Sequence, residues 1–224
     1  MDFETKMNSK PRRFLDKVYG FVLSNFLTIL LSIPIITMFS ALTTNMIVIL
    51  DVKENGSKGV FKFYFKTFWK YIEKTIVIGI VLTIMIAIAS FSMYFYRTRL
   101  DPSNIIGQIG YWVMLFISFV VLLFSLHLPL IICKFPSLRF MDTIRLSIYV
   151  CFRYFLYTLI LLIFTIIMIV GVIALPLWIF FGISVPQFFM EKFTQPMYFY
   201  LKKIDIEQIM KKAREIEEED DENE

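Results

Sequence analysis

The chain has 224 residues, of which 58% are hydrophobic, and its 23 Lys and Arg side chains outnumber 19 Asp and Glu to give a formal net charge of +4. Its charge-free stretches each reach or exceed the roughly 20 residues that a membrane-spanning helix needs. They cover Val18–Leu50, Thr75–Tyr96, Pro102–Cys133 and Tyr154–Met190. This composition excludes a soluble domain built around one buried helix, and it predicts an all-α fold, a polytopic transmembrane helical bundle.

The first apolar stretch is too long for one crossing. As a single helix, its 33 residues would extend over about 50 Å, whereas the hydrocarbon core is about 30 Å thick. Pro34 lies near its middle and lacks the amide hydrogen that would continue the helix. We therefore predict a proline-broken helical hairpin, with one arm ending near Ile33, the other beginning near Thr37, and both ends on the same side. The sequence leaves open whether the hairpin crosses twice or is re-entrant.

The distribution of basic residues supports the hairpin. With a hairpin, the segments on one side of the membrane (1–17, 51–74, 134–153 and 202–214) hold twenty Lys and Arg, and the other side holds two. A single crossing would give fifteen against seven. Because basic residues concentrate in short cytoplasmic loops, the pattern predicts a multi-pass protein of the plasma membrane with both termini in the cytoplasm.

Two basic amphipathic segments follow membrane helices. Phe61–Tyr71 places its lysines on one helical face beside an aromatic face, and Leu138–Arg153 repeats the pattern with arginines. The basic residues concerned are Lys62, Lys66 and Lys70 in the first segment and Arg139, Arg145 and Arg153 in the second. We expect these segments to lie flat among the headgroups of the bilayer, against anionic lipid at the inner face. Docking of a partner protein is the alternative.

Four further spans complete a bundle of about six membrane helices. They are predicted over Thr75–Tyr96, Ile105–Cys133, Tyr154–Leu175 and Leu177–Tyr200. The chain then divides into a cytoplasmic arm (1–13), a transmembrane domain (14–204) and a C-terminal segment (205–224). That last segment is expected to form a short amphipathic helix and a disordered acidic tail.

Five residues are candidates for a polar path through the membrane domain: Glu191, Gln195, Pro34, Asn25 and His127. Ionisable groups inside membrane spans are costly and often mark function. Glu191 and Gln195 lie one turn apart and could face the bundle interior together, while Pro34 frees a backbone carbonyl at membrane depth. For Asn25 the alternative is helix packing, for the lone His127 a hydrogen-bonded structural role, and for Glu191 a snorkelled or paired one.

No catalytic motif is recognisable. The sequence has no Gly-rich phosphate loop, no nucleophile elbow and no metal-ligand spacing, and Cys133 and Cys151 lack the ligand set of a metal site. The basic residues are dispersed along membrane edges, which argues against nucleic-acid binding. We therefore expect neither an enzyme nor a cofactor.

Several sequence pieces occur in the same order as in a known family. They are Asn25-Phe26-Leu27, Leu31-Ser32-Ile33-Pro34-Ile35-Ile36-Thr37, Phe61-Lys62-Phe63-Tyr64-Phe65-Lys66, His127-Leu128-Pro129-Leu130 and Phe181-Gly182-Ile183-Ser184-Val185-Pro186. In these pieces the chain resembles the YesL family of bacterial integral membrane proteins over about residues 14–204. The resemblance implies a companion of carbohydrate uptake and utilisation systems whose biochemical activity is unknown, so no site residues carry over.

Three functional hypotheses follow. The first is a non-enzymatic accessory or transport-associated membrane protein linked to carbohydrate uptake, with a membrane or ATP-driven transporter as partner. The second is a self-sufficient small-solute transporter that uses the polar path. The third is a permease-like subunit of an ATP-driven importer, in which Leu138–Arg153 docks the ATPase.

Overall fold

The fold is entirely helical over the residues that the computed structural model describes, which are 10–98, 105–174, 178 and 180–203. The long helices are α2 (Lys10–Leu31), α3 (Ile35–Asn55), α4 (Val60–Thr98), α5 (Ile105–Ser125), α8 (Phe155–Ala174) and α9 (Ser184–Lys203), with the shorter α6 (Leu128–Lys134) and α7 (Phe140–Arg153) between them. The predicted arm over 1–13 overlaps the described residues only in the first turns of α2, and the predicted segment over 205–224 lies outside them.

Four helices are long and apolar enough to cross a membrane. They are Phe14–Leu31, Ile35–Asn55, Val60–Thr98 and the α5–α6 stretch Ile105–Lys134; a fifth is gained if α7 and α8, bent by 101° at their junction, count as one span. This confirms a membrane helical bundle. The predicted number of six stays a prediction, since α9 is not among these helices and carries Gln187, Glu191, Lys192 and Gln195.

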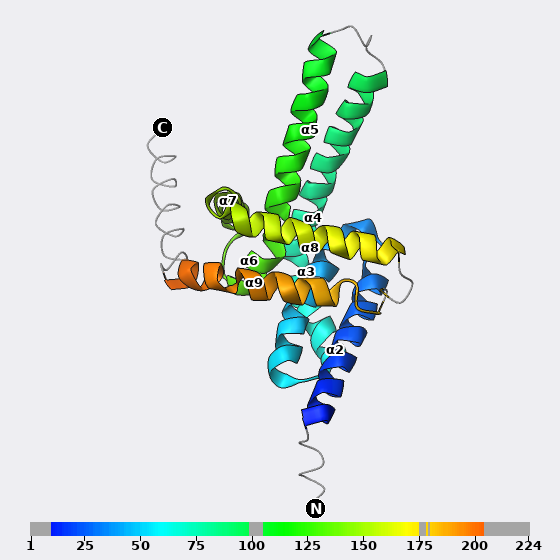
Figure 1. The fold of residues 1–224 in the computed structure, drawn as a ribbon, viewed down its shortest axis with the longest axis vertical. Helices are drawn as coiled ribbons and strands as arrows, with labels where there is room; N and C mark the ends of the chain where they lie inside the picture. The colour runs from blue at the N-terminus through cyan, green and yellow to red at the C-terminus, as the bar shows by residue number, and fades with distance from the viewer. Residues whose placement is uncertain (1–9, 99–104, 175–177, 179, 204–224) are drawn as a thin grey trace, which may run out of the picture.

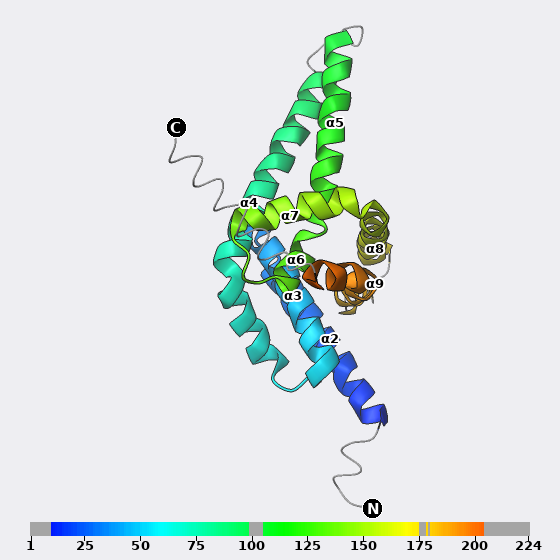
Figure 2. The ribbon, with the colours of Figure 1, turned by 90° about the vertical axis from the view of Figure 1, so that its left-hand side faces the viewer.

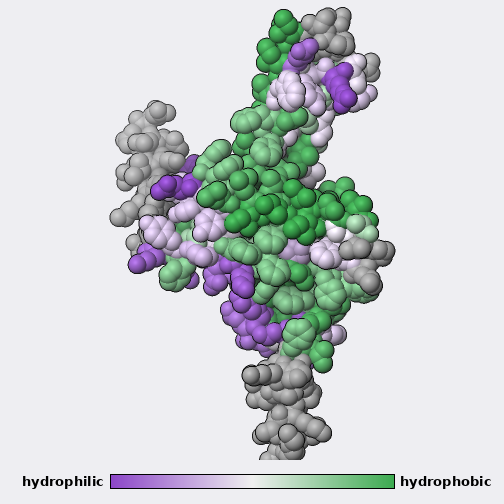
Figure 3. All heavy atoms as spheres, viewed as in Figure 1, coloured by the Kyte–Doolittle hydropathy of each residue, from purple (hydrophilic) through white to green (hydrophobic). Residues whose placement is uncertain are grey.

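The helices form an upright column with a crosswise pair (Figures 1 and 2). In both views α4 and α5 project together as an antiparallel pair, and α2 and α3 lie along the other half of α4. The antiparallel helices α8 and α9 lie crosswise to this column, so they pair as predicted but do not run alongside α4 and α5. Hydrophobic residues cover α8 and the adjoining part of α5, whereas hydrophilic residues gather near the connection of α3 to α4 (Figure 3).

The predicted hairpin is confirmed in α2 and α3. Pro34 is the N-cap residue of α3, and the Thr37 hydroxyl closes the apex by donating to the carbonyl of Leu31 at 2.7 Å. At the other end, Lys17 Nζ donates to the carbonyl of Lys53 at 2.8 Å. The two ends of the hairpin therefore lie together, as the charge distribution predicts.

The basic segment after the hairpin is not a separate helix as predicted, and its position flat among the headgroups stays a prediction. Phe61–Tyr71 and the following apolar stretch belong to one helix of 39 residues, about 58 Å long. The reason lies in packing against the hairpin, because Tyr64 is buried there and its hydroxyl lies 3.2 Å from the carbonyl of Ala41 and 2.9 Å from the Thr28 hydroxyl. These contacts hold the segment parallel to the arms.

The apex of the hairpin meets α4 at Gly79. A Cβ atom on Gly79 would lie 3.1 Å from the Cβ of Phe39 and 3.4 Å from the carbonyl oxygen of Ile36. Nineteen residues of α4 follow Gly79, about 28 Å of helix. The hairpin thus accompanies only the first half of α4.

Replacing Gly79 tests this crossing. We expect Gly79→Val to lower the free energy of unfolding by about 1 to 3 kcal/mol, because the added methyl groups would push α3 away from α4. Thermal unfolding in detergent measures the effect, with Ala87→Leu as the control because Ala87 is exposed on the same helix. Equal stability of the two variants would contradict the close approach at Gly79.

Candidate functional site

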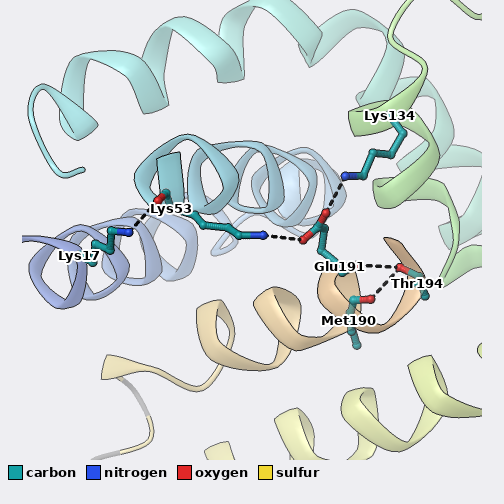
Figure 4. Close-up of polar contacts among 6 residues, drawn as sticks. All are labelled: Lys17, Lys53, Lys134, Met190, Glu191 and Thr194. Carbon is teal, nitrogen blue, oxygen red and sulfur yellow. Dashed lines mark hydrogen bonds and ion pairs between the residues drawn. The ribbon is translucent and has the colours of Figure 1, made fainter. Parts of the chain in front are cut away.

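The site is built around the buried carboxylate of Glu191 on α9, which is 2% exposed. Its Oε1 accepts a hydrogen bond from Lys134 Nζ at 2.6 Å, and its Oε2 lies 3.6 Å from Lys53 Nζ (Figure 4). Lys53 lies on α3 and is held against α2 by the contact with Lys17, while Lys134 ends α6. One carboxylate thus joins α3 and α6 to α9.

Gln195 does not share this site. It is exposed, whereas Glu191 is buried, so the prediction that both face the interior is wrong. The buried face of α9 runs through Gln187, Glu191, Thr194, Tyr198 and Leu201. This stripe advances by three or four residues at a time, and position 195 falls beside it.

Asn25 caps α9 from a distant helix. Its Oδ1 accepts hydrogen bonds from the backbone N–H groups of Ile183 and Ser184, each at 3.0 Å. The first N–H groups of a helix have no partner within it, so the Asn25 amide supplies one at the start of α9. Helix packing, one of the two interpretations of Asn25, is what the geometry shows.

A second amide pair lies beside this cap. Asn45 Nδ2 donates to Gln187 Oε1 at 2.8 Å, and Gln187 Nε2 donates to the carbonyl of Leu42 at 3.1 Å. The Ser24 hydroxyl donates to Asn45 Oδ1. We call the group Ser24, Asn25, Asn45, Ser184 and Gln187 the hairpin–α9 clasp. Sequence reasoning missed Ser184 and Gln187, although polar residues in an otherwise apolar stretch were a signal for them.

His127 is fully buried between three helices. Its Nδ1 lies 3.0 Å from the Tyr198 hydroxyl on α9 and its Nε2 lies 2.8 Å from the Thr158 hydroxyl on α8. The Thr158 hydroxyl also donates a hydrogen bond to the carbonyl of Cys151 at 3.1 Å. A neutral imidazole, which donates from one nitrogen and accepts at the other, satisfies this arrangement. His127 is thus placed as a hydrogen-bonded connector.

The remaining predicted residues lie at the surface. Pro34 is exposed at the hairpin apex, and exposed too are the basic residues Lys62, Lys66, Lys70, Arg139, Arg145 and Arg153. The structure therefore brings together none of the five polar-path candidates as one continuous route. Glu191, Asn25 and His127 each hold separate contacts between helices. Within the described residues, no three His, Cys, Asp or Glu side chains group as metal ligands would.

Comparison with protein-family models, curated proteins and solved structures gave no match. The resemblance to the YesL family therefore stays a prediction from the sequence pieces that carry it.

The ion pair predicts that removing the carboxylate lowers stability and that exchanging the two charges recovers part of the loss. We expect Glu191→Gln to lower the free energy of unfolding by about 2 kcal/mol, less than the roughly 3 to 5 kcal/mol of a fully buried broken pair, because Lys134 keeps 26% exposure. The swapped double variant Glu191→Lys/Lys134→Glu should recover part of the loss. Thermal unfolding in detergent measures both, with Lys192→Gln as the exposed neighbouring control. A Glu191→Gln variant as stable as that control would contradict a structural ion pair.

Proposed function

We propose that the protein is a non-enzymatic integral membrane protein that acts as an accessory component of a transport system. The observation that carries this proposal is the use of its buried polar side chains. Glu191 on α9 pairs with lysines of α3 and α6, and Asn25 on α2 caps the start of the same α9. Such contacts make a rigid body from the helices and leave the exposed surface as the part that can act.

The linings of the cavities favour an accessory protein over a self-sufficient sugar transporter. The cavity beside the hairpin–α9 clasp has a volume of about 160 Å³ and is lined chiefly by Leu, Met and Phe. Its one amide side chain, Gln187, is engaged by Asn45 and the Leu42 carbonyl. A site for a sugar needs free hydrogen-bonding groups to pair with buried hydroxyls.

In the proposed placement, α4 and α5 cross the plasma membrane as a helical hairpin. Both termini then lie in the cytoplasm. The apolar stretch Thr75–Tyr96 then spans the hydrocarbon core. Since the apex of the α2–α3 hairpin meets Gly79, that hairpin would enter only about 6 Å beyond Thr75. Of the two alternatives, this favours a re-entrant hairpin over a double crossing.

The proposed working surfaces are the exposed basic residues on the cytoplasmic side. Lys62, Lys66 and Lys70 stand in one exposed row on α4, with Trp69 67% exposed beside them. Such a row attracts anionic headgroups and equally offers contacts to an acidic partner surface. A membrane partner belonging to carbohydrate uptake is suggested by the resemblance to the YesL family alone.

A self-sufficient transporter is the second candidate, because Glu191 is an ionisable group buried in the bundle. The third candidate, a permease-like subunit, would use the exposed arginines of α7 to dock an ATPase.

Sugar uptake into cells separates the first two candidates. In a strain lacking the protein, uptake of radiolabelled sugars should fall, and wild type, Gln195→Ala and the swapped variant Glu191→Lys/Lys134→Glu should all restore it. An accessory protein needs the ion pair and not the carboxylate at position 191. The purified protein alone in liposomes should give no uptake above protein-free liposomes.

The opposite pattern would overturn the accessory role. If the swapped variant reaches the membrane at wild-type level but restores no uptake, and the purified protein carries sugar alone, the protein is itself the transporter.

A further inference from the structure

Three exposed lysines stand in a row on the outer side of α4. Lys62, Lys66 and Lys70 follow one another at four-residue intervals, which places them on one face of the helix. We call these three residues the lysine row. Tyr64 and Phe68, on the opposite side of α4, are buried against the hairpin. The row therefore points away from the hairpin and is open to a ligand outside the bundle.

The charge of the lysine row is not neutralised by the described residues. No described acidic side chain forms an ion pair with the row. The helix contains one acidic residue, Glu73, which lies about 10 Å along α4 from Lys66. Asp51 and Glu54 belong to α3, which packs on the opposite side of α4. An anionic ligand would thus meet the lower part of the row without a carboxylate beside it.

The distance of the row from the bilayer favours a ligand in the cytoplasm over a lipid headgroup. The proposed span of α4 begins at Thr75, and because α4 is one continuous helix, Lys66 and Lys62 lie about 14 and 20 Å before it. The headgroup layer on each side is only about 5 to 8 Å thick. In the proposed placement of α4, on which this step rests, these two lysines stand in water beyond the headgroups.

Exposed aromatic side chains accompany the lysine row. Phe61 is 58% exposed beside Lys62, and Trp69 is 67% exposed beside Lys70. Phe61 lies about 21 Å before Thr75, where acyl chains do not cover it. Exposed apolar side chains rimmed by polar ones mark sites of protein contact. This face thus fits a peptide that carries many acidic groups and some apolar ones.

The chain itself contains such a peptide. Glu215–Glu224 holds eight Asp and Glu residues, no Lys or Arg, and one aliphatic residue, Ile216. It begins twelve residues after Lys203, the last residue of α9. We call Glu215–Glu224 the acidic segment.

The end of α9 lies close enough for the acidic segment to reach the lysine row. Leu201 of α9 and Leu138 belong to one buried cluster, and the Leu138 carbonyl accepts a hydrogen bond from Lys74 Nζ on α4 at 2.5 Å. Lys66 is about 12 Å from Lys74 along α4. The twelve residues that lead to Glu215 extend over up to about 40 Å, so the segment reaches the row without any movement of the helices.

We propose that the acidic segment binds the lysine row of the same molecule, with its carboxylates against Lys62 and Lys66. Because the segment is tethered, its effective concentration at the row is on the order of mM. An acidic partner must therefore displace the segment before it can use the row. The segment thus controls access to the basic surface of α4, and this control does not depend on a role in sugar uptake.

Carbodiimide crosslinking of the full-length protein tests the contact. The reagent joins a carboxylate to an amine without a spacer, and mass spectrometry locates the joined residues. In phosphatidylcholine nanodiscs at low salt, we expect the acidic segment to be joined to Lys62 and Lys66, and these crosslinks to fall as the salt concentration rises. Lys192 is the control, because it is exposed on α9 about 16 Å from Lys203. The segment can reach it but should be joined to it far less often.

Proteolysis of variants tests the same contact without a crosslinker. In Lys62→Gln/Lys66→Gln, a glutamate-specific protease should cleave the acidic segment about fivefold faster than in wild type, because the segment is released from the row. The matched control Arg97→Gln/Lys192→Gln removes two positive charges at exposed positions outside the row, and it should be cleaved at the wild-type rate.

Three results would overturn the proposal. The first is equal cleavage of the row variant and its control, or crosslinks to the row no more frequent than those to Lys192. The second is release of the segment by Arg139→Gln/Arg145→Gln in place of the row variant, which would assign it to α7. The third is crosslinks found only in species of twice the monomer mass, which would assign it to a neighbouring copy. None of these measurements uses sugar uptake, so failure of the contact and failure of the accessory role are distinguishable.

Discussion

The amide of Asn25 is the contact on which the arrangement depends, because it joins the first helix to the last across 158 residues of chain. In a bilayer, free N–H groups at a helix start find no water and must be paired by protein. Asn25 pairs two of them at the start of α9, and Asn45 on α3, the other arm of the hairpin, binds Gln187 of α9 one turn further on. Without this clasp, few contacts would hold the short hairpin against the polar α9.

The polar contacts are confined to one part of the molecule. The clasp, His127 and the ion-paired Glu191 all involve α9. This crosswise helix is not among those long and apolar enough to cross a membrane. By contrast, the projecting halves of α4 and α5 expose Ile84, Phe91 and Phe116, which lipid can cover. The molecule thus combines a polar, internally bonded base with an apolar projecting pair of helices, and the function proposed for it assigns recognition to the base.

Much of this fold follows from local chemistry, and the rest depends on distant contacts. Pro34 and the charge distribution predict the α2–α3 hairpin, because a missing amide hydrogen and clustered lysines act within a few residues. The continuity of α4 and the exposure of Gln195 were not predictable in this way. Tyr64 holds the first half of α4 against the hairpin by reaching Ala41 on another helix, and the face that α9 buries is set by Asn25, Asn45 and Lys134. Glu191 was found from its charge alone, but neither of its lysine partners was.

The sidedness of the α2–α3 hairpin is tested most directly by cysteine accessibility in intact cells. Single cysteines at Asp16, Glu54 and Thr98, in a background that lacks Cys133 and Cys151, would be treated with a membrane-impermeant maleimide. The account predicts that positions 16 and 54 are shielded until the membrane is opened, while position 98, at the far end of α4, is labelled from outside. Labelling of only one of positions 16 and 54 from outside would contradict the hairpin and every cytoplasmic assignment that depends on it.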